Sequence, residues 1–170
     1  MNKFTPMDNM EGVWYRSTEI FKDERGHFFE EVRKSYFPVN VPEFIQDSIS
    51  YSKKGVLRGM HLQQNQWQLV TVLSGEIIDV VINLDADSQQ YRQSNSINLK
   101  WNSVNQILIQ PGIAHGYAVL NDFSIIHYKS SVYYGSSPQS GIHWQSMGVV
   151  NFWPKNDWIL SERDSKFESL

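Results

Sequence analysis

Two apolar runs separated by a short glycine turn constrain the fold of this chain most. The first run covers Leu69 to Leu73, the turn is Ser74-Gly75-Glu76, and the second run covers Ile77 to Ile82. Both runs are rich in the β-branched and aliphatic residues that favour strands. We therefore predict two strands that pair as a β-hairpin around the turn.

The rest of the chain consists of similar short segments bounded by Gly, Pro, Asn, Asp or Ser. The segment Val56 to His61 is expected to be an apolar strand, and short helical turns are expected at Lys34 to Phe37 and Glu162 to Phe167. Many short strands at fairly regular spacing indicate an all-β sandwich or jelly roll. The further predicted strands are Val13 to Ile20, Phe28 to Val32, Ile45 to Tyr51, Ser96 to Leu99, Gln106 to Ile109, Tyr117 to Leu120 and Ile125 to Val132.

Composition limits the class of protein and its partners. A chain of 170 residues is long enough to build one core, so a single domain over residues 1–170 is expected. It contains no cysteine, which excludes disulfides and thiolate chemistry. The net charge of -3, with no block of like charges, disfavours nucleic acid and anionic membranes as partners. Neither a signal peptide nor an apolar stretch of membrane-spanning length is visible, so a cytoplasmic protein is expected.

One segment contains a histidine after a Pro-Gly turn. Gln110-Pro111-Gly112-Ile113-Ala114-His115-Gly116 is similar to the second motif of the cupin superfamily of double-stranded β-helix barrels. Metal-binding cupins also have a His-x-His pair in a first motif, whereas this chain offers the single His61 in Gly59-Met60-His61-Leu62-Gln63. Two histidines are too few for a tight site, which needs three or four ligands. We therefore expect a barrel without metal.

Arg58 and His61 lie three positions apart on one predicted strand. Residues at odd spacing face opposite sides of a strand unless a bulge intervenes, and Gly59 lies between them. With a bulge at Gly59, both side chains would reach one cavity. The simpler alternative is that His61 is a hydrogen-bonded core histidine and that Arg58 pairs with a surface carboxylate.

Six fragments together resemble the dTDP-4-dehydrorhamnose 3,5-epimerase family in their order and approximate spacing, over nearly the whole chain. The resemblance implies a homodimeric enzyme with a cupin-like double-stranded β-helix, or jelly roll, and short terminal helices. Such enzymes invert carbons next to the keto group of a nucleotide-linked 4-keto-6-deoxyhexose. The fragments are Asp23-Glu24-Arg25-Gly26-His27-Phe28-Phe29-Glu30, Val56-Leu57-Arg58-Gly59-Met60-His61, Val72-Leu73-Ser74-Gly75-Glu76-Ile77-Ile78-Asp79-Val80, Pro111-Gly112-Ile113-Ala114-His115-Gly116, Tyr128-Lys129-Ser130-Ser131-Val132-Tyr133-Tyr134 and Leu160-Ser161-Glu162-Arg163-Asp164.

The resemblance also implies roles for three catalytic residues. His61 would be the base, Asp164 its carboxylate partner, and Tyr134 the acid on the opposite face of the sugar. Removing a proton next to a ketone needs a base, a donor for the enolate oxygen and an acid, so no cofactor is implied. Taken singly, Asp164 could be a surface carboxylate at a helix end and Tyr134 a half-buried strand aromatic.

Substrate contacts follow from the same resemblance. Arg25, Phe28 and Glu30 match a segment that reaches into the site of the partner subunit, where the arginine would neutralise pyrophosphate and Phe28 would pack on the nucleotide base. Gln46 and Arg58 match other pyrophosphate or sugar contacts, and His115 would bind the sugar at its keto face. The alternative for the first segment is a solvated turn that leads into a strand.

The chain departs from the family pattern at several positions. Gln68 replaces a lysine that would stabilise the enolate oxygen, and a neutral donor contributes less than a charged one. Lys129 is an alternative source of that charge. Ser48 stands where asparagine is frequent, and Gln145-Ser146 replaces an acidic pair.

The sequence thus predicts a cofactor-independent epimerase that acts at C3, C5 or both, in deoxysugar or bacterial surface polysaccharide biosynthesis. The homodimer would exchange its N-terminal segments. Two alternatives stay open. One is a C5-only epimerase or a keto-sugar isomerase on a CDP- or GDP-linked sugar, and the other is a non-catalytic nucleotide-sugar binding module.

Overall fold

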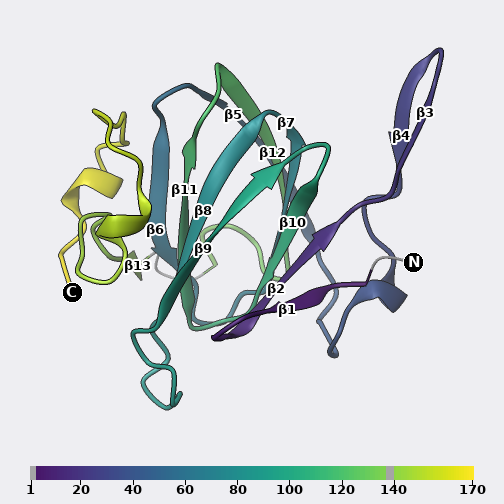
Figure 1. Cartoon of the computed structure of the whole chain (residues 1–170). Coiled ribbons are helices and arrows are strands. Elements are labelled where there is room, and N and C mark those ends of the chain that lie inside the picture. Colours follow the sequence, from purple (N-terminus) through teal and green to yellow (C-terminus); the bar gives the residue numbers. More distant parts are fainter. Residues whose placement is uncertain (1–2, 137–139) are drawn as a thin grey trace.

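The computed structural model describes residues 3–136 and 140–170, and these form two facing β-sheets with extra segments on their outer sides. Figure 1 shows the sheets curving around a common interior. The strands are β1 Thr5–Met7, β2 Met10–Ser17, β3 Ile20–Asp23, β4 Gly26–Phe29, β5 Gln46–Lys53, β6 Leu57–Leu62, β7 Gln68–Ser74, β8 Glu76–Asn83, β9 Ser94–Lys100, β10 Val104–Ile109, β11 Ile113–Val119, β12 Phe123–Ser130 and β13 Ser140–Gly141.

The strand order agrees with a jelly roll rather than with a simple meander. One sheet has the order β1-β2-β10-β7-β12-β5 and the other β13-β6-β11-β8-β9. The pairings within both sheets are antiparallel, and most of them join strands that are distant in sequence. Three 3-10 turns, Lys34–Tyr36, Val150–Phe152 and Asp164–Lys166, are the helical elements of the described residues. The all-β jelly roll is thus confirmed.

The predicted hairpin around Gly75 is wrong. The strands β7 and β8 follow one another in sequence, but β7 pairs with β10 and β12 while β8 pairs with β11 and β9 in the opposite sheet. Both strands are central, so their two faces are buried, and this explains the continuous apolar runs. Gly75 makes the corner at a φ of 86°, where a Cβ atom would lie 2.3 Å from the Phe123 carbonyl oxygen.

Three apolar clusters hold the layers together. The cluster between the sheets includes Val70, Val81, Ile107 and Tyr117. A second cluster lies outside the smaller sheet, where the segment from Ile142 to the C-terminus covers it. Figure 1 shows this C-terminal segment in yellow beside β6. The third cluster lies outside the larger sheet, beneath residues 32–44.

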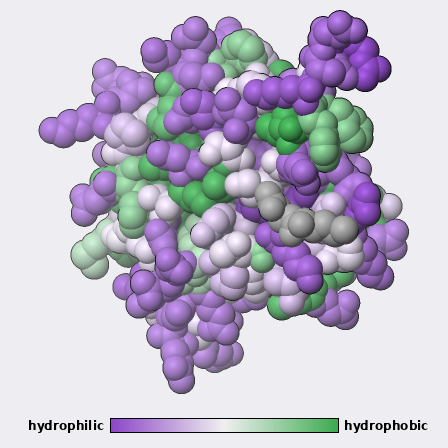
Figure 2. Space-filling model, turned by 45° about the vertical axis from the view of Figure 1, so that its right-hand side comes forward, coloured by the Kyte–Doolittle hydropathy of each residue, from purple (hydrophilic) through white to green (hydrophobic). Residues whose placement is uncertain are grey.

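The strands β3 and β4 pair only with each other and project from the body of the protein (Figure 1). Phe21 and Phe28 on this hairpin are 54% and 68% exposed. On the face shown in Figure 2, most of the surface is hydrophilic and the apolar side chains lie in separate patches. The exposed aromatic residues of the hairpin are therefore a local feature that the core of this chain does not explain.

Candidate active site

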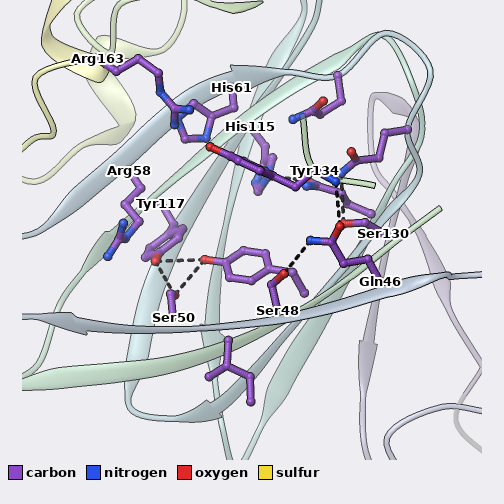
Figure 3. Close-up of a pocket in the computed structure, with 15 residues that line it drawn as sticks. Gln46, Ser48, Ser50, Arg58, His61, His115, Tyr117, Ser130, Tyr134 and Arg163 are labelled. Atoms are coloured by element: carbon purple, nitrogen blue, oxygen red, sulfur yellow. Dashed lines mark hydrogen bonds between the residues drawn. The ribbon is translucent and has the colours of Figure 1, made fainter. Parts of the chain in front are cut away.

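A cavity of about 460 Å³ opens between the two sheets, and this is a typical size for a site that binds a small molecule. Its lining comes from β5, β6, β7, β11 and β12 and from three segments outside the strands (Figure 3). Polar side chains predominate. The lining residues are Gln46, Ser48, Ile49, Ser50, Arg58, His61, Gln63, Gln66, Gln68, His115, Tyr117, Tyr128, Ser130, Tyr134 and Arg163.

Gly59 lets β6 direct both Arg58 and His61 into this cavity, as the spacing predicted. The register between β6 and β11 shifts between His115 and Tyr117, opposite Gly59. Gly59 has a φ of 119°, and a Cβ atom there would lie 2.5 Å from the Gly116 Cα atom. Arg58 Nε donates to Ser52 Oγ at 3.0 Å instead of pairing with a surface carboxylate.

His61 and Asp164 form a hydrogen-bonded pair. His61 Nε2 lies 2.9 Å from Asp164 Oδ1, while Asp164 Oδ2 accepts the Gly59 backbone N–H at 3.2 Å. Asp164 is 2% exposed, so it is a buried partner of the histidine and not a surface carboxylate. The 3-10 turn Asp164–Lys166 begins at this residue, and the C-terminal segment thereby reaches the cavity.

The surroundings shift the pKa values of both members of the pair. Burial alone would raise the pKa of Asp164, but hydrogen bonds from His61, the Gly59 N–H and Arg163 hold it well below its ordinary value. Burial lowers the pKa of His61, and the nearby His115 and Arg163 lower it further, although Asp164 opposes this. The two shifts favour a neutral imidazole beside an ionised carboxylate at pH 7, as a general base requires.

Arg163 is a site residue that the sequence analysis did not assign. Its Nη2 atom lies 2.9 Å from His61 Nε2, and its Nε donates to Asp164 Oδ1 at 3.2 Å. The available signal was its position next to Asp164 in the fragment Leu160-Ser161-Glu162-Arg163-Asp164. A cation therefore lies directly against the candidate base.

Tyr134 lines the same cavity from the loop that follows β12. Its backbone N–H donates to Gln46 Oε1 at 2.7 Å, and Gln46 Nε2 donates to Ser48 Oγ at 3.0 Å. In the view of Figure 3 its ring extends toward the part of the cavity that His61 lines. The side chain is 71% exposed and is therefore not the half-buried strand aromatic considered as an alternative.

His115 lies opposite His61 in the pairing of β11 with β6. Its Nδ1 atom is 3.3 Å from Asp79 Oδ2, and its Nε2 atom is 2.9 Å from Gln68 Oε1. Asp79 is fully buried, and burial raises the pKa of its carboxyl, although His115 opposes the shift. His115 and Gln68 thus lie together at the cavity wall.

A cluster of hydroxyl groups forms another part of the wall. Tyr117 and Tyr128 share hydrogen bonds of 3.0 to 3.1 Å with each other and with Ser50 (Figure 3). Tyr117 also bonds to Ser52 at 3.0 Å. Ser52 Oγ also accepts the hydrogen bond from Arg58 Nε. Burial raises the pKa of Tyr128 well above its ordinary value, with the neighbouring Tyr117 adding to the shift. These neutral hydroxyls were not singled out from the sequence, because tyrosine and serine are common in strands.

Lys129 does not lie in the cavity. Its neighbours Tyr128 and Ser130 line the cavity, so the strand period turns Lys129 to the outer face of β12. There its Nζ atom pairs with Asp47 Oδ1 at 2.6 Å. The expected substrate contact by Lys129 is therefore wrong for this structure.

Arg25, Phe28 and Glu30 also lie away from the cavity of their own chain. Arg25 pairs with Asp23 at the tip of the projecting hairpin, while Glu30 pairs with Arg33 and accepts a hydrogen bond from the Tyr36 hydroxyl. The single chain thus separates these three residues from the seven expected site residues that lie at the cavity. The expectation that the three serve a partner subunit stays a prediction.

Neither a metal cluster nor a membrane-spanning helix is found among the described residues. Across residues 3–136 and 140–170, no group of three or more His, Cys, Asp or Glu side chains is placed to hold a metal ion. No helix within the same ranges is long and apolar enough to cross a membrane.

Comparisons with known proteins identify relatives along the whole chain. The family model described as dTDP-4-dehydrorhamnose 3,5-epimerase matches residues 8–170. A dTDP-4-dehydrorhamnose 3,5-epimerase of Methanothermobacter thermautotrophicus is 35% identical over 169 residues, covering 95% of this chain and 91% of the relative.

Two solved structures extend the similarity to the fold. The dTDP-4-dehydrorhamnose 3,5-epimerase of Bacillus anthracis, with TDP and PPi bound, has a TM-score of 0.89 and 31% identity, with 100% of each chain covered. The dTDP-6-deoxy-D-glucose-3,5-epimerase of Legionella pneumophila, in complex with dTDP-4-keto-L-rhamnose, has a TM-score of 0.87 and 31% identity, covering 99% of this chain and 92% of that one.

Proposed function

The chain belongs to the dTDP-4-dehydrorhamnose 3,5-epimerase family, and from this premise we propose that it inverts C3, C5 or both in a dTDP-linked 4-keto-6-deoxyhexose without a cofactor. Membership makes the chain a nucleotide-sugar epimerase, which is an isomerase. The observation that carries the proposal is the hydrogen bond between His61 and Asp164 in the cavity that Tyr134 also lines.

His61 begins the proposed reaction as a general base. It removes the proton from the carbon next to the keto group, and the electron pair of the C–H bond moves to the keto oxygen to form an enolate. Asp164 orients the ring and stabilises the imidazolium that results, because its carboxylate lies 2.9 Å from Nε2. The histidine-carboxylate pair thus acts as a general base in its ordinary way, but it takes the proton from a carbon atom.

Tyr134 completes the proposed inversion as a general acid. Its hydroxyl gives a proton to the opposite face of the same carbon while the enolate returns to the ketone. The tyrosinate then takes a proton from water, and His61 releases its proton to water, so the enzyme is restored. Support for this role comes from the position of Tyr134 at the exposed mouth of the cavity, where solvent can exchange the proton.

Further residues would bind the nucleotide and the sugar of the substrate. We assign Arg58 to the pyrophosphate, since Ser52 holds its Nε and leaves the rest of the guanidinium toward the cavity. Gln46 is assigned to the sugar or pyrophosphate, and His115 and Gln68 to the keto face. Arg25, Phe28 and Glu30 would come from a second copy of the chain in a homodimer that exchanges the projecting hairpins.

The test is deuterium exchange in heavy water, followed by NMR, with a dTDP-4-keto-6-deoxyhexose and its CDP and GDP analogues. We expect deuterium at C3 and C5 of the dTDP sugar, together with inverted product. Exchange at C5 alone would instead identify the single-site epimerase.

The variant His61→Ala is expected to abolish exchange while the circular dichroism spectrum is retained, because the base is lost without a change in the core. Exchange near the wild-type rate in this variant would reject the role of His61.

Treatment with EDTA is expected to leave deuterium exchange unchanged. A loss of exchange that a divalent ion restores would contradict the proposed metal-free mechanism.

A further inference from the structure

A chain of polar groups crosses the interior from one sheet to the other, and one of its members has no role in the proposed reaction. Gln68 on β7 contacts His115 on β11, and His115 contacts Asp79 on β8. Asp79 is 0% exposed. Among the residues that the structure describes, its Oδ1 atom is the one buried side-chain nitrogen or oxygen without a hydrogen-bond partner.

The chemistry of the amide determines where the hydrogen atoms lie. An amide oxygen can only accept a hydrogen bond, so His115 Nε2 must carry a hydrogen to bond Gln68 Oε1 at 2.9 Å. At the other side of the ring, His115 Nδ1 lies 3.3 Å from Asp79 Oδ2, and one shared proton, on either of these atoms, would complete a hydrogen bond. A carboxylate with one unpartnered oxygen in the interior would be costly alone, and the shared proton keeps the pair neutral as a unit.

The other end of the amide is available to a ligand. Gln68 lines the cavity, and within residues 3–136 and 140–170 its Nε2 atom has no hydrogen-bond partner. A hydrogen bond to the carbonyl oxygen of an amide withdraws electron density, which strengthens the N–H groups as donors. The donor strength of Gln68 is thus coupled to His115 and, through it, to Asp79.

We propose that Asp79, His115 and Gln68 form a relay that makes the Gln68 amide nitrogen the donor to the enolate oxygen. The inference rests on the proposed function. As negative charge develops on that oxygen, the shared proton moves from Asp79 Oδ2 toward His115 Nδ1 and brings an imidazolium against the amide oxygen. No bond to the sugar changes in this step. In this step His115 and Asp79 act through the amide, and Gln68 touches the enolate oxygen.

The relay explains how a neutral amide can replace a cation at this position. Lys129 cannot provide the charge from its place on the outer face, where it pairs with Asp47. A hydrogen bond from an ionised donor is about twice as strong as a neutral one. An imidazolium at His115 therefore polarises the amide more strongly and recovers part of the loss. The buried Asp79 is required because only a nearby carboxyl can exchange the proton with His115.

The first test examines the free protein and is independent of activity. Side-chain nitrogen-15 NMR of the wild-type chain at pH 7 should show His115 Nε2 with an attached hydrogen and Nδ1 as an acceptor from the Asp79 carboxyl. In Asp79→Asn both nitrogens should keep these states, because the asparagine amide donates to Nδ1 but has no proton to release. A wild-type His115 Nε2 without hydrogen would overturn the relay, since the amide would then be donating to the ring.

The second test measures coupling in the wild-type reaction. Gln68→Ala should lower kcat about ten-fold with little change in KM, and Asp79→Asn should lower kcat roughly three-fold. In the Gln68→Ala background, Asp79→Asn should have no further effect, because it acts only through the amide. The variant Lys129→Met is the matched control and should keep wild-type exchange.

The outcomes separate the relay from the proposed function. The relay is rejected if the wild-type chain exchanges deuterium but Asp79→Asn lowers kcat by the same factor in the wild-type and Gln68→Ala backgrounds. A severe loss in Lys129→Met would also reject it. If no nucleotide sugar exchanges deuterium at all, the proposed function fails, whereas the NMR result still decides the hydrogen-bond arrangement. That spectrum needs only the wild-type chain, so it decides the relay even if Asp79→Asn does not fold.

Discussion

His61 lies between a carboxylate and a cation that compete for the same nitrogen. Its Nε2 atom is 2.9 Å from Asp164 Oδ1 and also 2.9 Å from Arg163 Nη2. A ring nitrogen with a hydrogen donates to the carboxylate, whereas a bare nitrogen accepts from the guanidinium, so the two contacts exclude one another at any instant. The cation therefore opposes protonation of His61, and the carboxylate favours it.

This competition predicts the pH dependence of an Arg163→Gln variant. Burial is the main cause of the lowered His61 pKa, and the Arg163 charge contributes to it. Removing that charge should raise the pKa of His61. Because the base acts when it is neutral, the increase of kcat/KM with pH on the acid side of the profile should then occur at higher pH. The measurement is the exchange rate from pH 5 to 9. Arg163→Lys retains the charge and should keep the wild-type limb, and an unmoved limb in Arg163→Gln would show that Arg163 does not tune the base.

Tyr134→Phe separates proton removal from proton return. The ring that lines the cavity remains, but the hydroxyl proposed to deliver the proton to the opposite face is lost. We expect net inversion to fall by roughly 100-fold, within the usual contribution of a general acid, while exchange on the original face falls much less. Proton NMR of one reaction in heavy water measures both rates. Equal losses of exchange and inversion would assign Tyr134 to binding instead.

A layer of buried polar groups attaches the segment after β4 to the outer face of the larger sheet. Arg16 and Gln106 both donate to the Glu31 carbonyl oxygen, at 2.6 and 2.9 Å. His127 lies between Glu31 Oε1 at 2.6 Å and Asp47 Oδ1 at 3.0 Å, and Lys129 pairs with the same Asp47 oxygen. These contacts connect β2, β10, β12 and β5 on the outer face of the sheet.

The layer should make stability depend on pH through His127. The hydrogen bond with Glu31 raises the pKa of His127, with Asp47 adding to it while burial and Lys129 oppose it. A histidine whose pKa is higher in the folded state than in the unfolded state stabilises the fold when it is protonated. This contribution is complete below the pKa of the unfolded state, about 6.5, and it is lost as the pH rises through the higher pKa of the folded state. Urea unfolding of His127→Gln should show about 1 kcal/mol less stability than wild type at pH 6 and a smaller difference at pH 9. Equal differences at the two pH values would contradict the charge-based account.

The sequence predicted most strands but not how consecutive strands pair. Local composition marks β7 and β8, whereas their membership of opposite sheets depends on the long-range partners β10, β12, β9 and β11. The same distinction applies to the site. Family fragments identified His61 and Asp164, which the fold brings together across 103 positions. Lys129 was misplaced because its inward or outward direction depends on the register of β12, which the fragment alone does not contain.

On the scale of the whole molecule, the projecting hairpin has features that its own chain does not use. Phe28 is exposed, and the Arg25 side chain is 86% exposed at the tip, where its partner is the neighbouring Asp23. An aromatic face and a cation are the two groups that would bind a nucleotide base and a pyrophosphate. The cavity of the same chain lies elsewhere, so a second copy is the occupant that would bring hairpin and cavity together.

Complementation between two inactive variants tests this exchange. One chain carries His61→Ala and has an intact hairpin, and the other carries Arg25→Ala with Phe28→Ala and has an intact cavity. In a dimer with exchanged hairpins, each mixed dimer contains one site with both defects and one site with none. Random pairing at equal amounts makes half of the dimers mixed, so about one quarter of all sites should be intact.

Co-expression of the two chains, with exchange measured by NMR in heavy water, should therefore restore about one quarter of wild-type turnover. Each variant expressed alone provides the baseline, and a tag on one chain verifies that mixed dimers form. If the hairpin served its own cavity, every site in the mixed dimer would carry one defect and turnover would not exceed the baseline. Mixed dimers without recovered turnover would thus exclude the exchange and leave Arg25 and Phe28 outside the site.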